Sequence, residues 1–246
     1  MLERHFARLR TRDELSVEEE QAIRKAIGEY REHPADHVIV KPGVELTHST
    51  LLLDGIVCRY KDLRNGQRQI TEIHVAGDFA DLHSFTLKRL DHTIMSLTPC
   101  RVAEVPHARL TEITRQSPHL TRLYWFSTNL DAAIHREWEI SLGRRTARAK
   151  IAALFCELFI RLEIIGLTDG FNYHLGLTQT DLGDCTGLTN VHVNRTLKDL
   201  RDSGLVTYQD GKVSILNWKR LAHAGEFDAA YLYLEKRKRY PRDVVR

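Results

Sequence analysis

The sequence predicts an α+β protein with an N-terminal antiparallel β-roll of the jelly-roll kind, a long central helix and a C-terminal winged helix-turn-helix. Short runs rich in Val, Ile, Thr and Leu, separated by glycine-containing turns, follow Pro34 and predict the roll. From about Pro118, apolar residues recur at alternating spacings of three and four, which predicts one long helix. Two short helical patterns joined by a glycine turn and followed by a hairpin pattern predict the winged motif. The expected units are residues 1–117, 118–143 and 144–246.

Composition sets outer limits on the protein. The 246 residues exceed one typical domain and suffice for two cores, and a net charge of +3 is too mild to identify a nucleic-acid partner. The N-terminus lacks the apolar core of a signal peptide, and charged residues interrupt the most apolar stretch, residues 151–167, so we expect a cytoplasmic protein without a membrane span. The cysteines form no C-x-x-C pair, which argues against zinc-ribbon and dithiol motifs and favours buried free thiols: Cys58, Cys100, Cys156 and Cys185.

The N-terminal region combines one helix with several strands. Residues 16–29 open with a serine and three acids before apolar residues at helical spacing, which predicts a capped amphipathic helix. Asn65-Gly66 lies between two alternating runs and predicts a two-residue hairpin turn, because both turn residues must tolerate positive φ. Strands this short, at this spacing, form an antiparallel roll, sandwich or barrel.

The seam of the long helix has two interpretations. It either packs within its own domain or pairs with the same helix of a second chain, and neighbouring apolar residues 124–126 would allow both. The seam residues, expected at a dimer contact, are Leu120, Leu123, Ser127, Leu130, Ile134 and Trp138. The next helix has a broad apolar face suited to a domain core; its members are Ile151, Leu154, Phe155, Leu158, Leu162 and Ile165. The basic run at residues 233–246 is typical of a solvated tail, with phosphate contact as the alternative.

Residues 178–204 read as two helices and a turn. Thr178 is suited to cap the first helix with Asp181 as its box partner, and Gly187 supplies the turn. Thr189 caps the second helix, and Gly204 ends it in the left-handed conformation. The inward positions of the second helix are Val193, Leu197 and Leu200. A hairpin around Asp210-Gly211 then predicts the wing.

The outward face of the second helix forms one strip beginning at its N-terminus. A helix in the DNA major groove needs such a strip, since arginine can donate twice to guanine and asparagine can pair twice with adenine. The expected base-reading residues are Asn190, Val191, Asn194 and Arg195. The expected phosphate ligands are Thr178, Thr189, His192 and Lys198. A merely solvated face would show Glu–Lys pairs at i,i+4 instead.

The chain resembles the Crp/Fnr family of bacterial transcription regulators, which joins a cyclic-nucleotide-binding-like roll to a winged helix-turn-helix. The resemblance rests on "LTQTDLGDCTGLTNVHVNRTL", "LLLDGIVCRYKDLRNGQRQI", "VAGDF" and "CRVAEVP". It implies a homodimeric, sequence-specific DNA-binding transcription regulator that reads an inverted-repeat operator with the 189–203 helix, with RNA polymerase as a further partner. It implies that Arg195 reads a base. Val191 stands where the family often has a glutamate that reads cytosine, and Asn190 stands where some members have arginine. A half-site unlike the usual consensus is therefore expected, with Val191 against a thymine methyl.

The sensor end departs from the cyclic-nucleotide-binding relatives. Asp81-Leu82 replaces the glycine–glutamate pair that holds the ribose, and an aspartate or leucine near residue 91 replaces the phosphate-binding arginine, although Arg89 would supply it in a shifted alignment. Cyclic AMP is thus not expected. The expected effector-pocket residues are Gly77, Asp78, Phe79, Asp81, Leu82, Asp91, His92 and Thr93. Either an unidentified effector occupies this pocket or the protein acts without one.

Other cofactors and function classes find little support in the sequence. The first cysteine is Cys58, so the N-terminal cysteine cluster of the iron–sulfur branch is missing, and the histidines of the roll have no metal-ligand spacing. We find no phosphate loop, paired-carboxylate motif or nucleophile signature, and we expect no enzyme. The alternative function is a small-molecule-binding signalling module whose C-terminal domain contacts protein rather than DNA.

Overall fold

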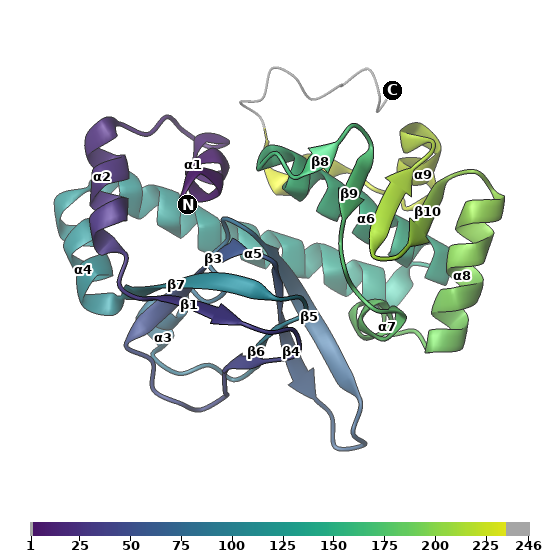
Figure 1. Cartoon of the computed structure of the whole chain (residues 1–246), viewed down its shortest axis with the longest axis horizontal. Helices are drawn as coiled ribbons and strands as arrows, with labels where there is room; N and C mark the ends of the chain where they lie inside the picture. The colour runs from purple at the N-terminus through teal and green to yellow at the C-terminus, as the bar shows by residue number, and fades with distance from the viewer. Residues whose placement is uncertain (1, 235–246) are drawn as a thin grey trace.

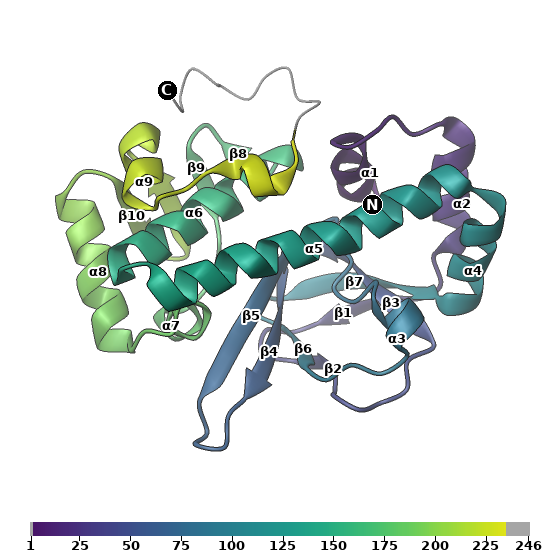
Figure 2. The ribbon, with the colours of Figure 1, turned by 180° about the vertical axis from the view of Figure 1, so that it is seen from behind.

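The computed structural model describes residues 2–234, and Figure 1 shows the roll and the C-terminal helical region side by side along one long helix. Seen from behind, this helix, α5, runs across both regions (Figure 2). Within the described residues, no helix is long and apolar enough to cross a membrane. Residues 235–246 of the basic run at 233–246 lie outside the described residues, so the expected role of this run stays a prediction.

Two helices precede the roll, α1 (Glu3–Arg10) and α2 (Val17–Ala26). The capped helix predicted for residues 16–29 is confirmed as α2, since Ser16 and Glu19 form a reciprocal capping box. Helix α1 was not predicted. Its Phe6 is fully buried in a cluster with Phe79 and Tyr124, so the N-terminal segment belongs to the core of the roll.

The roll consists of two antiparallel sheets, with strand orders β1-β7-β3 and β2-β6-β4-β5. Its strands are β1 (Tyr30–His33), β2 (Val38–Val40), β3 (His48–Asp54), β4 (Ile56–Asp62), β5 (Arg68–Val75), β6 (Thr93–Ser96) and β7 (Cys100–Pro106). A short helix, α3 (Ser84–Leu87), lies between β5 and β6. Strands β3 and β4 are buried over most of their length, because each has neighbours on both faces.

The β4–β5 hairpin forms where Asn65-Gly66 predicted it, but its turn is longer than two residues. The amide of Leu63 donates to the carbonyl of Gln67, closing a loop over residues 63–67. Only Gly66 takes positive φ, at 81°. The Asn65 side chain accepts a hydrogen bond from the amide of Gln67 at 3.0 Å instead of entering the left-handed region. Asparagine therefore stabilises this turn through its side chain.

Helix α4 (His107–Gln116) leads into α5 (Pro118–Arg144), the predicted long helix. Leu120, Leu123, Ile134 and Trp138 are each at most 7% exposed within the single chain. Of the two interpretations of the seam, packing within its own chain holds for these four residues, because the roll and the C-terminal region cover them. Ser127 and Leu130 are partly buried.

Helix α6 (Ala147–Ile164) is buried on nearly all sides, not on the one face that its apolar stripe predicted. Every residue from Ile151 to Leu162 is buried, including Glu157 and Arg161. The reason is its position, since α5, α8, α9 and the strands of the C-terminal sheet all contact it. A charged residue in this helix must find its partner inside the protein.

The C-terminal region contains α7 (Gln179–Thr186), α8 (Asn190–Asp202) and α9 (Trp218–Ala224), followed by a short 3₁₀ turn, η1 (Ala229–Leu232). Its sheet has the order β10-β11-β9-β8, with β8 (Thr168–Asp169), β9 (Asn172–His174), β10 (Val206–Gln209) and β11 (Lys212–Ile215). The hairpin predicted at Asp210-Gly211 is confirmed, with φ of 49° and 74°. The β8–β9 hairpin was not predicted. All four cysteines are free and buried.

Candidate nucleic-acid interface

Helices α7 and α8 form the predicted helix-turn-helix, and a tight turn holds them together. Gly187 ends α7 with φ of 66°, and the amide of Leu188 donates to the carbonyl of Gly183. A Cβ at Gly183 would lie 2.6 Å from the Leu188 carbonyl oxygen, so only glycine permits this approach. Gly183 was not singled out in the sequence analysis. The available signal was that a glycine stands inside a helical pattern, where it usually has a packing reason.

The two N-caps are formed as predicted, but they leave different groups free. The carboxylate of Asp181 accepts from both the amide and the hydroxyl of Thr178, at 2.8 Å and 2.6 Å. Thr189 accepts from the amide of His192 at 3.3 Å, and within residues 2–234 its hydroxyl proton is donated to no group. Thr189 therefore keeps a donor for a phosphate, whereas the Thr178 hydroxyl is already committed.

The predicted strip lies on the solvent side of α8. The core side carries Val193 and Leu200, both fully buried, and Leu197, partly buried. Val191 is 81% exposed, the most of any large apolar residue in the described chain. The members of the strip that are exposed are Asn190, Val191, Asn194, Arg195 and Lys198, while His192 is half-buried beside them.

Two amide side chains of the strip contact α7. The amide of Asn190 donates to the hydroxyl of Thr180 at 3.1 Å, and that of Asn194 donates to Gln179 at 3.4 Å. These contacts restrict the two asparagine side chains before any ligand arrives, and they add the exposed Gln179 and Thr180 to the same surface. Sequence reading missed both residues because the contact lies between helices.

The charge of the strip is unopposed. The acids of α8, Asp199 and Asp202, lie in its second half and pair with Arg148 and Arg201. Arg195 forms no ion pair within residues 2–234. A free guanidinium near a helix N-terminus, where unpaired amides also point outward, suits an anionic ligand.

The wing lies beside the N-terminus of α7. The hydroxyl of Tyr208 donates to the carbonyl of Leu177, one residue before the cap. A Cβ at Gly211 would lie 2.9 Å from Gly176, so the wing tip packs closely on the preceding loop. Lys212, the first residue of β11, is exposed at this wing tip.

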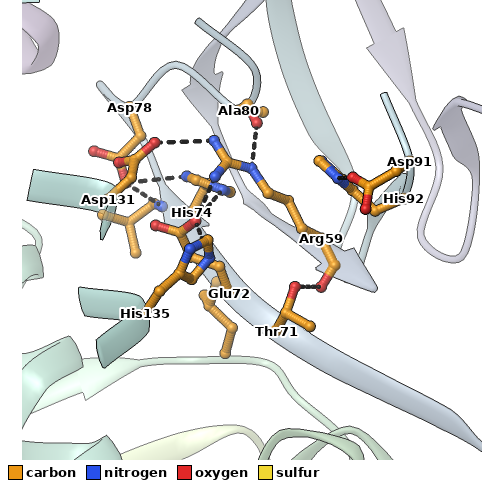
Figure 3. Close-up of polar contacts among 12 residues, drawn as sticks. Arg59, Thr71, Glu72, His74, Asp78, Ala80, Asp91, His92, Asp131 and His135 are labelled. Atoms are coloured by element: carbon orange, nitrogen blue, oxygen red, sulfur yellow. Dashed lines mark hydrogen bonds and ion pairs between the residues drawn. The ribbon is translucent and has the colours of Figure 1, made fainter. Parts of the chain in front are cut away.

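The contact between the roll and α5 is filled by charged side chains of the protein itself (Figure 3). Arg59 of β4 donates to the carbonyl of Ala80 at 2.7 Å, to Glu72 at 2.6 Å and to Asp131 of α5 at 3.0 Å. Nε2 of His135 in α5 lies 2.9 Å from the Glu72 carboxylate, and this contact raises the pKa of His135. Sequence reading missed this network, whose only signal was a charged residue inside each of two apolar strands.

The first three predicted pocket residues contact helices instead of a cavity for a nucleotide. Asp78 pairs with Arg8 of α1 at 2.6 Å and with Arg161 of α6 at 2.9 Å. The carbonyl of Gly77 lies 2.8 Å from Nδ1 of His5, and a Cβ on Gly77 would lie 2.8 Å from the backbone of Arg4. The ring of Phe79 meets His5 and Tyr124 edge-on. These residues join α1 and α6 to the roll.

The remaining predicted pocket residues are dispersed. Asp81 is fully buried and accepts from the amide of Thr50, and burial raises the pKa of its carboxyl to about 7. Asp91 is exposed and pairs with Lys61 and His92, which lower its pKa. Thr93 is buried in β6. Arg89 pairs with Glu45 at the surface and does not enter the roll.

The cavity beside these residues is small. It borders Gly77, Asp78, Phe79 and Leu82 and has a volume of about 40 Å³. Such a volume holds one or two water molecules, whereas pockets for small ligands measure about 300–1,000 Å³. Within residues 2–234, no group of three or more His, Cys, Asp or Glu residues could hold a metal ion.

Sequence comparisons match both regions. Residues 30–117 match the cyclic nucleotide-binding domain, and residues 149–224 match the Crp-like helix-turn-helix domain. The nitrogen fixation regulation protein FixK of Bradyrhizobium diazoefficiens is 30% identical over 176 residues, covering 69% of this chain and 70% of the relative. The transcriptional activator protein FnrL of Cereibacter sphaeroides is 27% identical over 210 residues, covering 82% and 83%.

Solved structures share the fold. That of FixK2 from Bradyrhizobium japonicum superposes with a TM-score of 0.73 at 23% identity, covering 80% of this chain and 96% of the other. The c-di-GMP-responsive regulator CLP of Xanthomonas campestris gives a TM-score of 0.62 at 15% identity, covering 79% and 96%. The chain belongs to the Crp/Fnr family of bacterial transcription regulators.

Proposed function

We propose that the protein is a homodimeric, sequence-specific transcription regulator that reads an inverted-repeat operator with α8. The observation that carries the proposal is the exposed strip on the first turns of this helix, with an unpaired Arg195 and two asparagines held by α7. Arg195 donates to a guanine, and the asparagines and Val191 contact neighbouring bases. Thr189, His192, Lys198 and the wing bind phosphates and set the position on the duplex.

The second copy binds the exposed face of α5, opposite the buried seam. This face carries Trp125, Asn129, Ala132 and Arg136 at spacings of four, three and four, and Trp125 is 67% exposed. A groove of about 500 Å³ between α3, α4 and α5 adjoins Trp125 and has mostly apolar walls. An exposed tryptophan beside an apolar groove is typical of a protein contact. Two α8 helices related by a twofold axis then enter major grooves about 34 Å apart.

The contact between the roll and α5 is the place where a small molecule would act on the dimer helix. Arg59 is satisfied there by Glu72 and Asp131 of the same chain, and the nearby cavity is too small for a nucleotide. This arrangement favours DNA binding by the free protein, without cyclic AMP or an iron–sulfur cluster. The protein then acts in the bacterial cytoplasm as a non-enzymatic regulator, with RNA polymerase as its further partner.

The test is in-vitro selection of random duplex DNA with the purified full-length protein, without added ligand and at fixed physiological salt. Enrichment of an inverted repeat is the expected result, since a twofold dimer reads the same half-site twice. Selection is repeated with cell extract added, which supplies any missing effector. Failure to enrich a repeat in both selections contradicts the proposal.

Arg195→Ala separates DNA reading from the alternative, a signalling module whose C-terminal domain contacts protein. The variant should lose about 1–3 kcal/mol of discrimination at one base position. Arg201→Ala, at the far end of the same helix, is the matched control and should keep the base preference. Equal base preferences for both variants would contradict the assignment of Arg195.

A further inference from the structure

The β4–β5 hairpin of the roll reaches the first helix of the helix-turn-helix through one arginine. Arg68, the first residue of β5, donates through Nε to Asp184 at 2.8 Å and through Nη2 to Asp181 at 2.9 Å. Both acids lie on α7, which packs beside β5 (Figures 1 and 2). Gln69 adds a third contact, since its amide donates to the carbonyl of Asp184 at 2.7 Å.

The roll holds Arg68 in place from the other side. Its guanidinium lies over the ring of Tyr60, 5.4 Å from the centroid, and 3.7 Å from the sulfur of Met95. Its side chain is 21% exposed, as is that of Asp184, while that of Asp181 is 8% exposed. A guanidinium fixed by stacking and shared between two part-buried carboxylates loses little entropy on pairing, unlike an exposed ion pair.

Asp181 links this contact to the shape of the DNA-reading motif. One carboxylate oxygen accepts from the cap residue Thr178, and the other accepts from Arg68. The Asp181 side chain, which forms the capping box of α7, is therefore also the side chain that Arg68 of the roll contacts. Since α7 in turn holds Asn190 and Asn194 of α8, the orientation of the reading strip is fixed relative to the hairpin.

A second bridge joins the same two regions at a deeper level. Arg161 of α6 donates to Asp78 and to the carbonyl of Ile73 at 2.9 Å and 2.7 Å, and it is 2% exposed. That bridge belongs to the core, so its loss would disturb folding. The Arg68 bridge lies at the edge of the interface and acts directly on the reading motif.

We propose that Arg68 is a positioning residue for operator recognition, which sets the separation between half-sites that the dimer accepts. This inference rests on the proposed function. Each α8 reads its own half-site, and the Arg68 bridge fixes where that helix stands relative to its roll and hence to the dimer axis. Without the bridge, each motif keeps its base preference, and the two motifs tolerate a wider range of separations.

The experiment compares the full-length wild type with Arg68→Ala on one selected inverted repeat whose central spacer is lengthened or shortened by one and two base pairs. A duplex with one half-site, intact or scrambled, measures base preference separately. We expect the variant to keep its preference for the intact half-site. Its discrimination between the best spacer and a spacer changed by one base pair should fall about fivefold, the order of one ion-pair contribution.

Matched variants distinguish positioning from a general loss of charge or fold. Arg64→Ala removes the same charge from the exposed tip of the same hairpin and should leave the spacer profile unchanged. Arg68→Lys keeps one of two carboxylate contacts and should give an intermediate profile. Asp184→Asn removes the negative charge that Arg68 faces and leaves the α7 cap intact. It should act in the same direction as Arg68→Ala and keeps the test available where Arg68→Ala fails to fold.

The outcomes separate the inference from the proposed function. Identical spacer profiles for wild type, Arg68→Ala and Asp184→Asn would overturn the role of Arg68 while the regulator proposal stands. Loss of half-site preference in parallel with spacer discrimination would also overturn it, because Arg68 would then support the fold of the motif. If the wild type enriches no inverted repeat in the selection without or with cell extract, that result contradicts the proposed function and therefore this inference as well.

Discussion

Asp78 and Arg161 form a buried ion pair between the roll and α6, with 2.9 Å between carboxylate and guanidinium. Asp78 lies directly after Gly77, in the segment that follows the end of β5 at Val75. Its other carboxylate oxygen lies 2.6 Å from Nε of Arg8. One carboxylate thus joins the N-terminal helix, the roll and the C-terminal region. In this fold the Asp78 carboxylate holds these regions together instead of binding a ligand.

Replacing this carboxylate should destabilise the protein strongly. Asp78→Ala leaves Arg161 buried with Glu157 as its remaining carboxylate partner, and Arg8 loses its partner as well. We expect a loss of about 3–5 kcal/mol in the free energy of unfolding, measured by urea denaturation. Asp54→Ala removes an Asp–Arg pair that also joins α1 to the roll but is 56% exposed at the carboxylate, and it should cost less than about 1 kcal/mol. Equal costs would contradict the role of Asp78.

Val191→Glu should change which base the operator prefers at one position. The wild-type valine is exposed and apolar and fits a thymine methyl, whereas a glutamate accepts a hydrogen bond from the amino group of cytosine. Repeating the in-vitro selection with this variant should move one position of each half-site toward C·G. Arg201→Glu places the same acid near the end of α8 and should weaken all sequences alike. An unchanged preference at every position would show that Val191 meets no base.

Local signals predicted much of this structure. Ser16, Thr178 and Thr189 cap helices where predicted, because a cap needs only a side chain and an amide three residues away. The wing turn at Asp210-Gly211 was also predictable from a local signal, because both residues tolerate positive φ. The outward strip of α8 also followed from periodicity alone.

Non-local pairing escaped prediction. Periodicity identified the apolar seam of α5 but not the surface that covers it. The pattern therefore left Leu123 open between its own domain and a partner chain, and the structure shows that the roll covers it. Arg59 and Asp131 are 72 residues apart, and nothing in either local pattern indicates their contact. The same holds for Arg68 and Asp181, which are 113 residues apart. Charged residues acquire such roles through topology, which the sequence pattern does not specify.

The buried carboxyl of Asp81 should make stability depend on pH. Burial raises its pKa to about 7, against opposing contributions from Thr50 and Arg59, while in the unfolded chain the value is about 3.9. The folded protein therefore retains this proton, and the stability from it is complete below about pH 4 and lost as pH rises through about 7. Asp81→Asn keeps the acceptor for the amide of Thr50 and does not titrate. The free energy of unfolding of this variant minus that of the wild type should rise by about 2–4 kcal/mol from pH 4 to pH 8, measured by urea unfolding.

Asp91→Asn is the control for this pH dependence. Its carboxyl is exposed and its pKa is lowered by Lys61 and His92, so it stays ionised throughout this range. The stability difference between this variant and the wild type should therefore stay nearly constant from pH 4 to pH 8. If Asp81→Asn and wild type show parallel curves over this range, the buried carboxyl does not hold its proton in the folded state.

Trp125→Ala should weaken self-association without weakening the fold. Its indole is 67% exposed in the single chain, so its removal opens no internal cavity, whereas at a dimer contact a buried tryptophan contributes about 2 kcal/mol or more. Sedimentation equilibrium should show a dimer dissociation constant at least about thirtyfold higher than that of the wild type. Val17→Ala, equally exposed on α2, is the matched control and should associate as the wild type does. If both variants associate like the wild type, the outer face of α5 is not the contact. That outcome would place the second copy elsewhere on the protein. It would not move the contact to Leu120, Leu123, Ile134 and Trp138, because these residues are buried within their own chain.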